Sequence, residues 1–298
     1  MAELGLRPGV HVLEVAGDFS DINDLHMDAD LVYDLASANS VNIARIIAQI
    51  PYYVASYLKA ITIEGKSIGD PVDVSVPSGN FGNALSAIIA RHMGVPLRNI
   101  IVATNENNVL DTLFREGLFN KSEFQHTNSS AQDIRMPSNI WRYFGMLYGN
   151  DPDKISELFQ QYKAKGSVKL TDISDIDKSF IHGIISVTVR KDDRARTIRK
   201  VFDESGSQQT IIDPHTANGV AAIEMLQAQD KDVPMLAMET AKPFKFDETV
   251  SDVLGMLPPR PVRFKGLEEK QVGRHLTQIE DLDGLLAYLD THTQAKKK

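Results

Sequence analysis

The sequence predicts an α/β fold built on a parallel sheet, and the order of its elements supports that prediction. A valine-rich run at Val72–Val76 has the length and composition of a buried strand, and a glycine-containing turn at residues 77–82 follows it. A helix at Ala84–Met93, a second strand at Asn99–Ala103 and a second helix at Val109–Glu116 come next. Strands that alternate with helices are typical of a parallel sheet, because each helix returns the chain to the end where the next strand begins.

Two elements precede this region. Val10–Val15 is predicted as a buried strand that the chain enters almost at once. A long helix is predicted at Ser40–Ile61, and Pro51 is expected to kink or interrupt it, because proline lacks a backbone donor and clashes with the preceding turn. The apolar face of this helix is made by isoleucines at helical spacing, namely Ile43, Ile46, Ile47 and Ile50.

The middle of the chain shows a different sequence pattern, and the last part returns to the alternation of strands and helices. Helical patterns and charged runs dominate in the middle, whereas Asp213–Pro214 is typical of a helix start and Val233–Met238 of a strand. We therefore expect an α/β region at residues 1–123, a mainly helical insertion at 124–204, and a return to the α/β region with C-terminal helices at 205–298.

The composition of the 298-residue chain excludes several classes of protein. Charged residues make up 24% and hydrophobic residues 42%, as in ordinary globular proteins. A formal net charge of -8 gives no electrostatic basis for binding nucleic acid or an anionic membrane surface. The absence of cysteine excludes disulfides and thiol nucleophiles, and it favours a reducing cytoplasm. No stretch reaches the roughly 20 apolar residues of a membrane helix, and no cluster of His, Asp and Glu has metal-ligand spacing.

The turn after the valine-rich strand is the first candidate binding site. It places two glycines at the start of a helix, where unpaired amides and the helix dipole favour an anion and a phosphate can approach the backbone closely. The motif is neither a Walker A loop nor a dinucleotide fingerprint. A phosphate site and a merely tight turn are equally compatible with it. The residues concerned are Gly79, Asn80, Phe81, Gly82 and Asn83.

A second candidate group opens the long helix and consists of Asn39, Ser40, Asn42 and Arg45. These residues suit either an anion site assisted by the helix dipole or a plain N-cap with a solvated turn, and the sequence does not separate the two. Taken alone, Thr240 after a strand is more typical of a sheet or cap residue, and His215 of a structural histidine.

Several separated motifs resemble those of threonine synthases, in the same order and over nearly the whole chain. The turn motif Val76–Gly82 is followed by Ala103–Asn107, and a polar helix start at Asn39–Asn42 precedes both. Further matching motifs are Pro137–Asn139, Asp213–Ala217 and Glu239–Pro243. One such match would be weak, but a series in register is a specific signal.

This resemblance implies a pyridoxal 5'-phosphate enzyme of fold type II, which converts O-phosphohomoserine and water into threonine and phosphate. The turn from Gly79 to Asn83 would cradle the cofactor phosphate through backbone amides, and the Thr240 hydroxyl would meet the pyridine nitrogen. The residues expected to bind the substrate are Asn39, Ser40, Asn42, Arg45 and Asn105.

The chain departs from the family in a respect that bears on catalysis. Threonine synthases carry the Schiff-base lysine in an earlier segment, in a motif like Phe-Lys-Asp that does not occur here. A Schiff-base lysine is desolvated, which argues against lysines among polar turn residues such as Lys66, Lys121, Lys154 and Lys191. Lys242 lies nearest to a family site, although the family accepts other residue types there. We therefore expect this chain to match the C-terminal two-thirds of the family, to be incomplete at its N-terminus and to be inactive alone.

Three functional hypotheses follow from these observations. The first is a truncated threonine synthase. The second is a noncatalytic threonine synthase-like module that binds phosphate or a protein partner. The third is another fold-type II activity, such as β-elimination, which the motifs at Asn39–Asn42 and Thr104–Asn107 disfavour. An incomplete sheet exposes apolar surface, so self-association is also expected.

Overall fold

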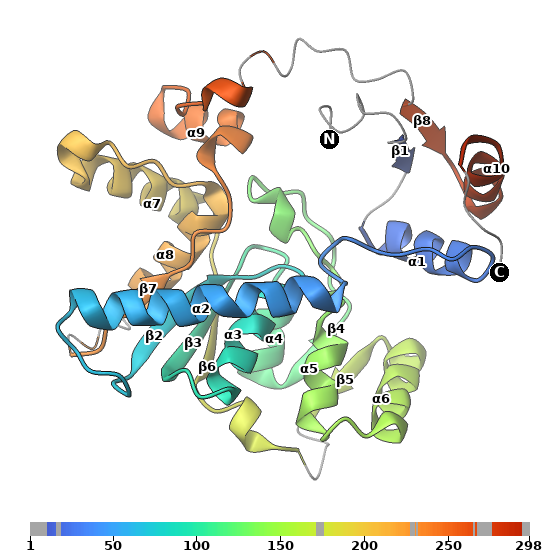
Figure 1. The fold of residues 1–298 in the computed structure, drawn as a ribbon, viewed down its shortest axis with the longest axis horizontal. Coiled ribbons are helices and arrows are strands. Elements are labelled where there is room, and N and C mark those ends of the chain that lie inside the picture. The colour runs from blue at the N-terminus through green and yellow to red at the C-terminus, as the bar shows by residue number, and fades with distance from the viewer. Residues whose placement is uncertain are drawn as a thin grey trace. The chain divides into compact units, whose positions relative to one another are not determined.

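The computed structural model describes residues 11–15, 19–170, 176–226, 230, 232–264, 266 and 276–293. The chain divides into two compact units (Figure 1). The larger unit runs from Ala38 to Pro258, and the smaller one combines the described residues up to Ser37 with those from Pro259 onward. This division differs from the three ranges expected from sequence, because packing joins the first and last segments of the chain.

The larger unit is built on a four-stranded parallel sheet with the strand order β6-β3-β2-β7. β2 (Val72–Pro77) and β3 (Leu97–Thr104) form its centre, and β6 (Ile184–Thr188) and β7 (Met235–Ala237) form its edges. Every residue of β2 is buried, as is typical of a strand covered on both faces. The predicted parallel sheet and its two central strands are confirmed.

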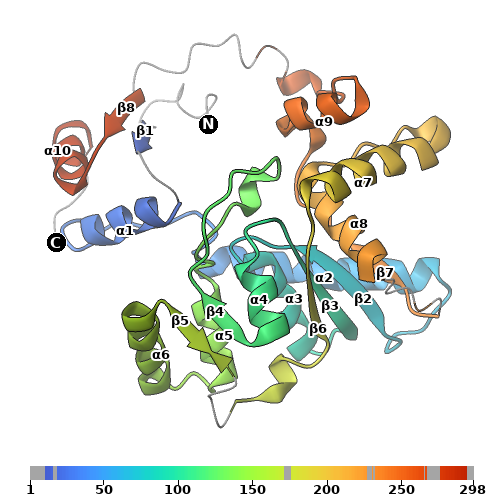
Figure 2. The same ribbon diagram turned by 180° about the vertical axis from the view of Figure 1, so that it is seen from behind.

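Helices cover both faces of this sheet, as the opposite views in Figures 1 and 2 show. On one face, Val102 and its neighbours pack into the main core with three helices, α2 (Ile43–Ile63), α3 (Gly82–His92) and α4 (Val109–Glu116). On the other face, Ile101 and Ala103 pack against α8 (Pro214–Leu226). Because side chains alternate across a strand, successive residues of β3 supply two different cores.

The helix α2 continues without a break through Pro51, so the expected interruption is wrong. Both halves of the helix bury large side chains against the main core, including Ile46 before the proline and Tyr53 after it. Tertiary packing of an apolar face therefore outweighs the cost of a proline inside the helix, which is about 3 kcal/mol.

Residues 124–204 do not form an insertion separate from the sheet. The helices expected there are present as α5 (Ile140–Leu147), α6 (Pro152–Lys165) and α7 (Lys191–Glu204). The same stretch also contributes β6, which pairs with β3, and β5 (Ser167–Lys169), which pairs antiparallel with β4 (Leu118–Asn120). The five residues of β6 form an edge strand between charged segments, and so short a run gives little periodicity to detect.

Shorter elements complete the larger unit. α9 (Asp247–Leu254) follows β7, and 3-10 turns lie at Ser130–Gln132, Lys178–Phe180, Gly206–Gln208 and Pro243–Lys245. Among the helices that the structure describes, none is long and apolar enough to cross a lipid bilayer.

The smaller unit joins the two ends of the described chain. β1 (Val12–Val15) pairs in parallel with β8 (Leu276–Ile279), flanked by α1 (Phe19–Asp30) and α10 (Leu282–His292). The predicted first strand is confirmed over Val12–Val15, whereas Val10 lies outside the described residues. Another 3-10 turn, Val262–Phe264, lies within the described part of this unit.

The register of the large sheet determines the edge at which the candidate site lies. Ser75 of β2 pairs with Ala237 of β7, and Pro77 pairs with Ala103 of β3. Neighbouring parallel strands thus end at one edge, where the turn after Pro77 and the segment after Ala237 leave the sheet together. Ligands of open α/β sheets bind beyond this carboxyl edge.

The attachment of β6 to the sheet can be tested at Gly183. Its φ is +69°, and a Cβ there would overlap the carbonyl oxygen of Arg98 in β3. Gly65 has nearly the same φ, +63°, with open space around the Cβ position, so it makes a matched control. We expect Gly65→Ala to lower the free energy of unfolding by about 1 kcal/mol, and Gly183→Ala by at least about twice as much. Urea unfolding measured by circular dichroism provides the comparison, and equal losses would contradict the close approach of the two strands.

Candidate functional site

A cavity of about 950 Å³ lies at the carboxyl edge of the large sheet. One wall is a face of α2, and a second is the turn between β2 and α3. The remaining walls are the segment at Ala131 and Gln132, the residues from Leu236 to Ala241, and the ring of His215. Segments far apart in sequence thus meet around one space, the usual arrangement of a small-molecule site.

The turn between β2 and α3 keeps its shape because Phe81 is buried. Phe81 adopts a left-handed conformation with φ 64°, which costs a non-glycine residue about 1–2 kcal/mol. The residue is 1% exposed, and its ring contacts the rings of Phe114 and Tyr143 at centroid distances of 5.6 and 5.5 Å. Burial of the aromatic ring offsets the backbone strain and fixes the turn above it.

The N-terminus of α3 and Ser78 together suit an anion. No side chain caps this helix, so its first amides rely on other acceptors. Ser78 lines the cavity and is 3% exposed, yet its hydroxyl has no hydrogen-bond partner among the described residues. An unpaired buried hydroxyl is costly, and an anion seated at the helix N-terminus would satisfy it.

Asn80 and Asn83 both line the cavity, but their side chains also hold the turn in place. Asn80 donates to the Ser40 hydroxyl at 2.6 Å and accepts from the Ser138 amide at 2.6 Å. The Asn83 oxygen accepts from the Tyr53 hydroxyl at 2.6 Å, and burial raises the pKa of the Tyr53 phenol, which keeps it a donor. The amide nitrogen of Asn83 is therefore the end of that side chain available to the cavity.

The two glycines of the turn lie next to different parts of the structure. A Cβ on Gly79 would lie 2.7 Å from the Cα of Gln132 and 3.0 Å from the carbonyl oxygen of Ala131. A Cβ on Gly82 would lie 3.3 Å from the side-chain nitrogen of Asn139. Close approach of another backbone segment thus requires glycine at position 79, in addition to any approach by a ligand.

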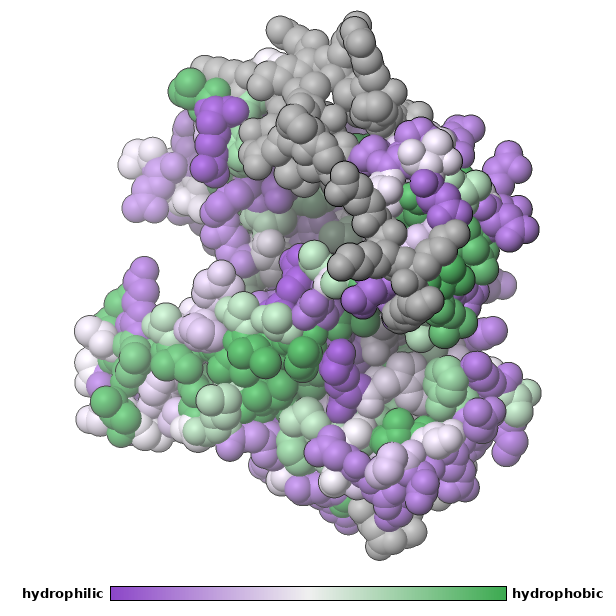
Figure 3. Space-filling view, turned by 45° about the vertical axis from the view of Figure 1, so that its right-hand side comes forward, coloured by the Kyte–Doolittle hydropathy of each residue, from purple (hydrophilic) through white to green (hydrophobic). Residues whose placement is uncertain are grey.

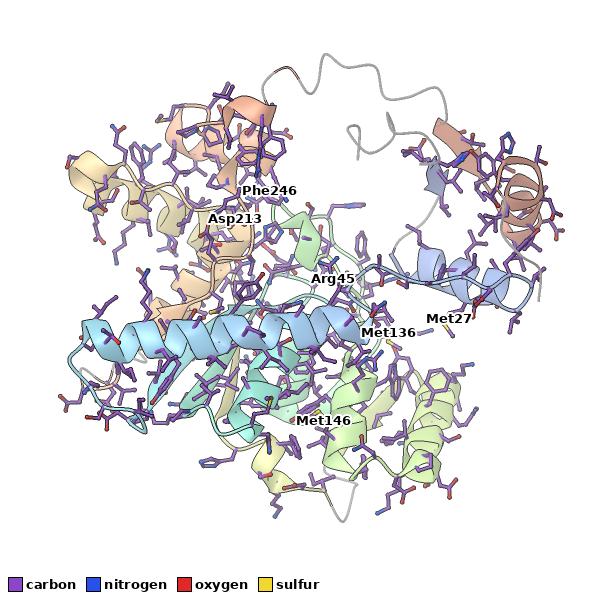
Figure 4. All side chains as sticks on the ribbon, viewed as in Figure 1. Met27, Arg45, Met136, Met146, Asp213 and Phe246 are labelled. Atoms are coloured by element: carbon purple, nitrogen blue, oxygen red, sulfur yellow. The ribbon has the colours of Figure 1, made fainter. Side chains whose placement is uncertain are left out.

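Of the residues expected to bind the substrate at the start of the long helix, Ser40 and Arg45 line the cavity. Arg45 is exposed on α2 and donates to the Ala38 carbonyl at 3.1 Å (Figure 4). Asn42 caps α2 by accepting from the Ala44 amide, and Asn39 accepts from the Val41 amide, each at 2.9 Å. Neither asparagine lies on the cavity wall, so the capping interpretation describes them better.

Asn105 does not line the cavity, contrary to the expectation from sequence. It is 1% exposed, and its side-chain nitrogen donates to Asp133 at 2.7 Å and to Thr127 at 2.9 Å. Its neighbour Glu106 pairs at 3.1 Å with the fully buried guanidinium of Arg194. The end of β3 therefore supports residues 125–133, which carry the Ala131 and Gln132 wall.

Thr240 and His215 complete the site. Thr240 lines the same cavity as the Gly79 turn, and its amide donates to the Thr216 hydroxyl at 3.2 Å. His215 is buried and pairs with Asp213 at 2.8 Å. Burial alone would raise the pKa of the Asp213 carboxyl, but hydrogen bonds from His215 and Thr216 outweigh it and hold that pKa below its ordinary value.

Apart from Arg45, sequence reasoning missed the part of the cavity wall made by α2. Its polar residues recur every three or four positions at Arg45, Gln49, Tyr52, Ser56 and Lys59, and all of them line the cavity. That spacing is itself a helical signal for a second, polar face.

Lys242, considered from sequence as a catalytic lysine, does not line the cavity. Its side chain is 62% exposed and pairs at 2.7 Å with Glu239, which does line the cavity. In the described part of the chain, no group of three or more His, Asp or Glu could hold a metal ion.

Comparisons with known proteins find sequence similarity over much of this chain. The family profile described as "Threonine synthase, C-terminal" matches residues 216–288. A threonine synthase of Methylobacillus glycogenes is 37% identical over 237 residues, which cover 78% of this chain and 48% of that protein. The chain is similar to threonine synthases over about half of their length.

Solved structures agree with this relationship. Yeast threonine synthase superposes with a TM-score of 0.79 at 30% identity, covering 98% of this chain and 61% of that one. The threonine synthase of Brucella melitensis, solved with bound pyridoxal phosphate, gives 0.78 at 28% identity, covering 96% and 60%. The fold-type II architecture expected from the resemblance is confirmed, and the chain spans about half the length of the curated relatives it matches.

The different neighbours of the two glycines lead to a test. Gly79→Ala must displace backbone atoms of the 131–132 segment, so we expect a loss of about 1–3 kcal/mol in unfolding free energy. In Gly82→Ala the only tight contact of the added Cβ is with the Asn139 side chain, and the Ser40 carbonyl oxygen lies at an ordinary 3.8 Å, so we expect a loss under about 1 kcal/mol. Both are measured by urea unfolding, and a milder effect at position 79 than at 82 would show that the 131–132 segment does not press on the turn.

Proposed function

We propose that this chain is the cofactor-phosphate-binding part of a threonine synthase-like enzyme, which converts O-phosphohomoserine and water into threonine and phosphate with pyridoxal 5'-phosphate. The observation that carries the proposal is the presence, around one cavity, of an anion-accepting turn and Thr240. Similarity to threonine synthases over most of the chain supports the same assignment.

The residues around the cavity fit the chemistry of this cofactor. Its phosphate would be bound by the first amides of α3 in the turn from Gly79 to Asn83, with the unpaired Ser78 hydroxyl as a further donor. The hydroxyl of Thr240 would hydrogen-bond the pyridine nitrogen without fixing a full positive charge on it. When bound, pyridoxal 5'-phosphate supplies an electron sink for the negative charge that develops on the substrate.

Substrate binding is proposed for the α2 side of the cavity. Ser40 offers a hydroxyl and Arg45 a permanent positive charge, which suits the phosphate or carboxylate of O-phosphohomoserine. Asn39, Asn42 and Asn105 would act indirectly, through the shape of the helix start and the loop at residues 125–133.

The two lysines at or near the cavity are poorly suited to form a Schiff base with the cofactor. A Schiff-base lysine needs a desolvated position that lowers its pKa. Lys59 lines the cavity but is exposed, and Lys242 is exposed and paired with Glu239. We propose that the chain does not supply that lysine. The same observation favours a second candidate function, a noncatalytic threonine synthase-like module that binds phosphate or a protein partner.

Self-association and a cytoplasmic location remain predictions. The first is supported by apolar residues exposed along α2, where Figure 3 shows hydrophobic residues gathered. These residues include Ile43, Ile47, Val54 and Leu58. Apolar surface of this kind favours association with a second copy of the chain.

Phosphate-dependent binding is the direct test of the cofactor assignment. Calorimetry should show that the chain binds pyridoxal 5'-phosphate but not pyridoxal, which lacks the phosphate. Ser78→Ala should weaken binding by about tenfold, because it removes a hydrogen bond to a charged group. The exposed Ser207→Ala serves as the control and should bind like the wild type. Equal affinity for pyridoxal would refute the phosphate cradle.

The proposed absence of the catalytic lysine predicts an inactive chain. Incubation with pyridoxal 5'-phosphate, borohydride reduction and mass spectrometry should reveal no preferentially labelled lysine. No phosphate should be released from O-phosphohomoserine under conditions in which full-length yeast threonine synthase is active. A fusion that adds the N-terminal part of the yeast protein should gain activity. Turnover by this chain alone would overturn the claim and direct attention to Lys59 and Lys242.

A further inference from the structure

The N-terminus of α8 holds a buried carboxylate whose hydrogen bonds extend beyond the helix backbone. One oxygen of Asp213 accepts from the His215 amide at 2.9 Å and from the ring nitrogen Nδ1 of His215 at 2.8 Å. The other oxygen accepts from the amide and from the side-chain hydroxyl of Thr216. A carboxylate that only capped the helix would need the two amide bonds alone. The bonds to two side chains suggest a second role.

The bond to His215 leads to one wall of the cavity. The backbone amide of Ala131 donates to Nε2 of His215 at 3.0 Å. Because a backbone amide can only donate, Nε2 carries no proton, and the proton of the neutral ring is on Nδ1, directed at Asp213. The ring also contacts Phe246 at a centroid distance of 4.5 Å. Asp213 thus fixes the tautomer and orientation of the group that holds Ala131.

The bond to Thr216 leads to a second wall. The Thr216 hydroxyl gives its proton to Asp213, which leaves its oxygen to accept from the Thr240 amide at 3.2 Å. Thr216 is 4% exposed, so water does not compete readily for these bonds. The position of Thr240 therefore depends on the direction of the Thr216 hydroxyl, which Asp213 sets.

We propose that Asp213 is a positioning residue that couples these two walls. Through His215 it holds the 131–132 segment against the Gly79 turn, and through Thr216 it holds the backbone of Thr240. The phosphate end and the ring end of the bound molecule would then be set by one carboxylate. This inference rests on the proposed function for the identity of that molecule, but the coupling itself concerns only residues of this chain.

Asp151 provides a matched control. It caps α6 by accepting from the amides of Asp153 and Lys154 at 3.0 and 3.3 Å, and it does not line the cavity. Asp151→Ala and Asp213→Ala each remove a helix cap, so both should lower the unfolding midpoint by a few degrees. Only the loss of Asp213 should reach the cavity walls.

Amide hydrogen exchange at pH 7.5, where the Asp213 carboxyl is ionised, tests the coupling. Asp213→Ala should speed exchange of both the Ala131 and the Thr240 amide by about tenfold, as expected for loss of a hydrogen-bonded charged partner. His215→Ala should speed only Ala131, and Thr216→Val only Thr240. Asp151→Ala should affect neither.

A conservative variant sharpens the test in case Asp213→Ala folds poorly. In Asp213→Asn the amide oxygen should face His215, because its backbone amide and its Nδ1–H both donate, whereas the Thr216 hydroxyl can also accept, so the side-chain nitrogen faces Thr216. Exchange should then accelerate at Thr240, while Ala131 and the Nδ1-protonated state of His215, read from ring nitrogen shifts, stay near the wild type. If Asp213→Ala and Asp213→Asn leave both amides within about twofold of the wild type, Asp213 is only a cap and the proposal is overturned.

Ligand binding separates this proposal from the proposed function. Calorimetry with pyridoxal 5'-phosphate should show about tenfold weaker binding for Asp213→Ala and no change for Asp151→Ala. If the wild type does not bind this compound, the proposed function fails, and the exchange rates still decide whether the walls are coupled. Undiminished binding by Asp213→Ala would overturn the positioning role.

Discussion

The parallel pairing of β2 with β3 on one side and β7 on the other is the constraint on which the cavity depends. It makes three strands end at one edge, so that residues more than a hundred positions apart leave the sheet side by side. Alternation along the strands then gives each face its own core, one with α2, α3 and α4 and one with α8. α3 and α8 consequently begin close to the same edge and bring their N-terminal ends to the cavity.

Buried polar groups stabilise the irregular segments at this edge. Residues 125–133 have little regular structure, and they are held by Asn105 and Asp133 and by Arg194 with Glu106. Arg194 has no exposed surface, and its remaining donors reach the Val189 carbonyl and the side chains of Asn128 and Asn218. Burying such groups is unfavourable unless each finds a partner, so removal of one would leave the others unpaired. The network specifies a single conformation for the loop, whatever its net effect on stability.

The sequence predicted the local part of this architecture well. The strand, turn and helix around Gly79 could be recognised because strand composition, glycine and helical periodicity all act within a few residues. The strand β6 and the passage of α2 through Pro51 could not, since both are decided by packing against segments distant in sequence. Asn105 was assigned to the substrate because its position after a strand suggested the cavity, whereas its partners come from a loop whose path the sequence does not reveal.

The role of His215 shows a further limit of sequence reasoning. A histidine after proline at a helix start gives no indication of the Ala131 amide that meets it. The polar face of α2, in contrast, was present in the sequence as a regular spacing from Arg45 to Lys59 and could have been found. Which residues face a ligand is therefore partly a local property and partly a consequence of how distant loops fold over it.

The helix α2 divides its circumference into three sectors. One is buried in the core, one lines the cavity, and the third leaves Ile47 and Leu58 in solvent. Residues on the third sector contribute to neither of the others, so they can be exchanged for charged residues without disturbing the core or the binding surface. These exposed apolar residues of α2 are thus suitable positions for substitutions that raise the solubility of the protein and leave the residues of the cavity unchanged.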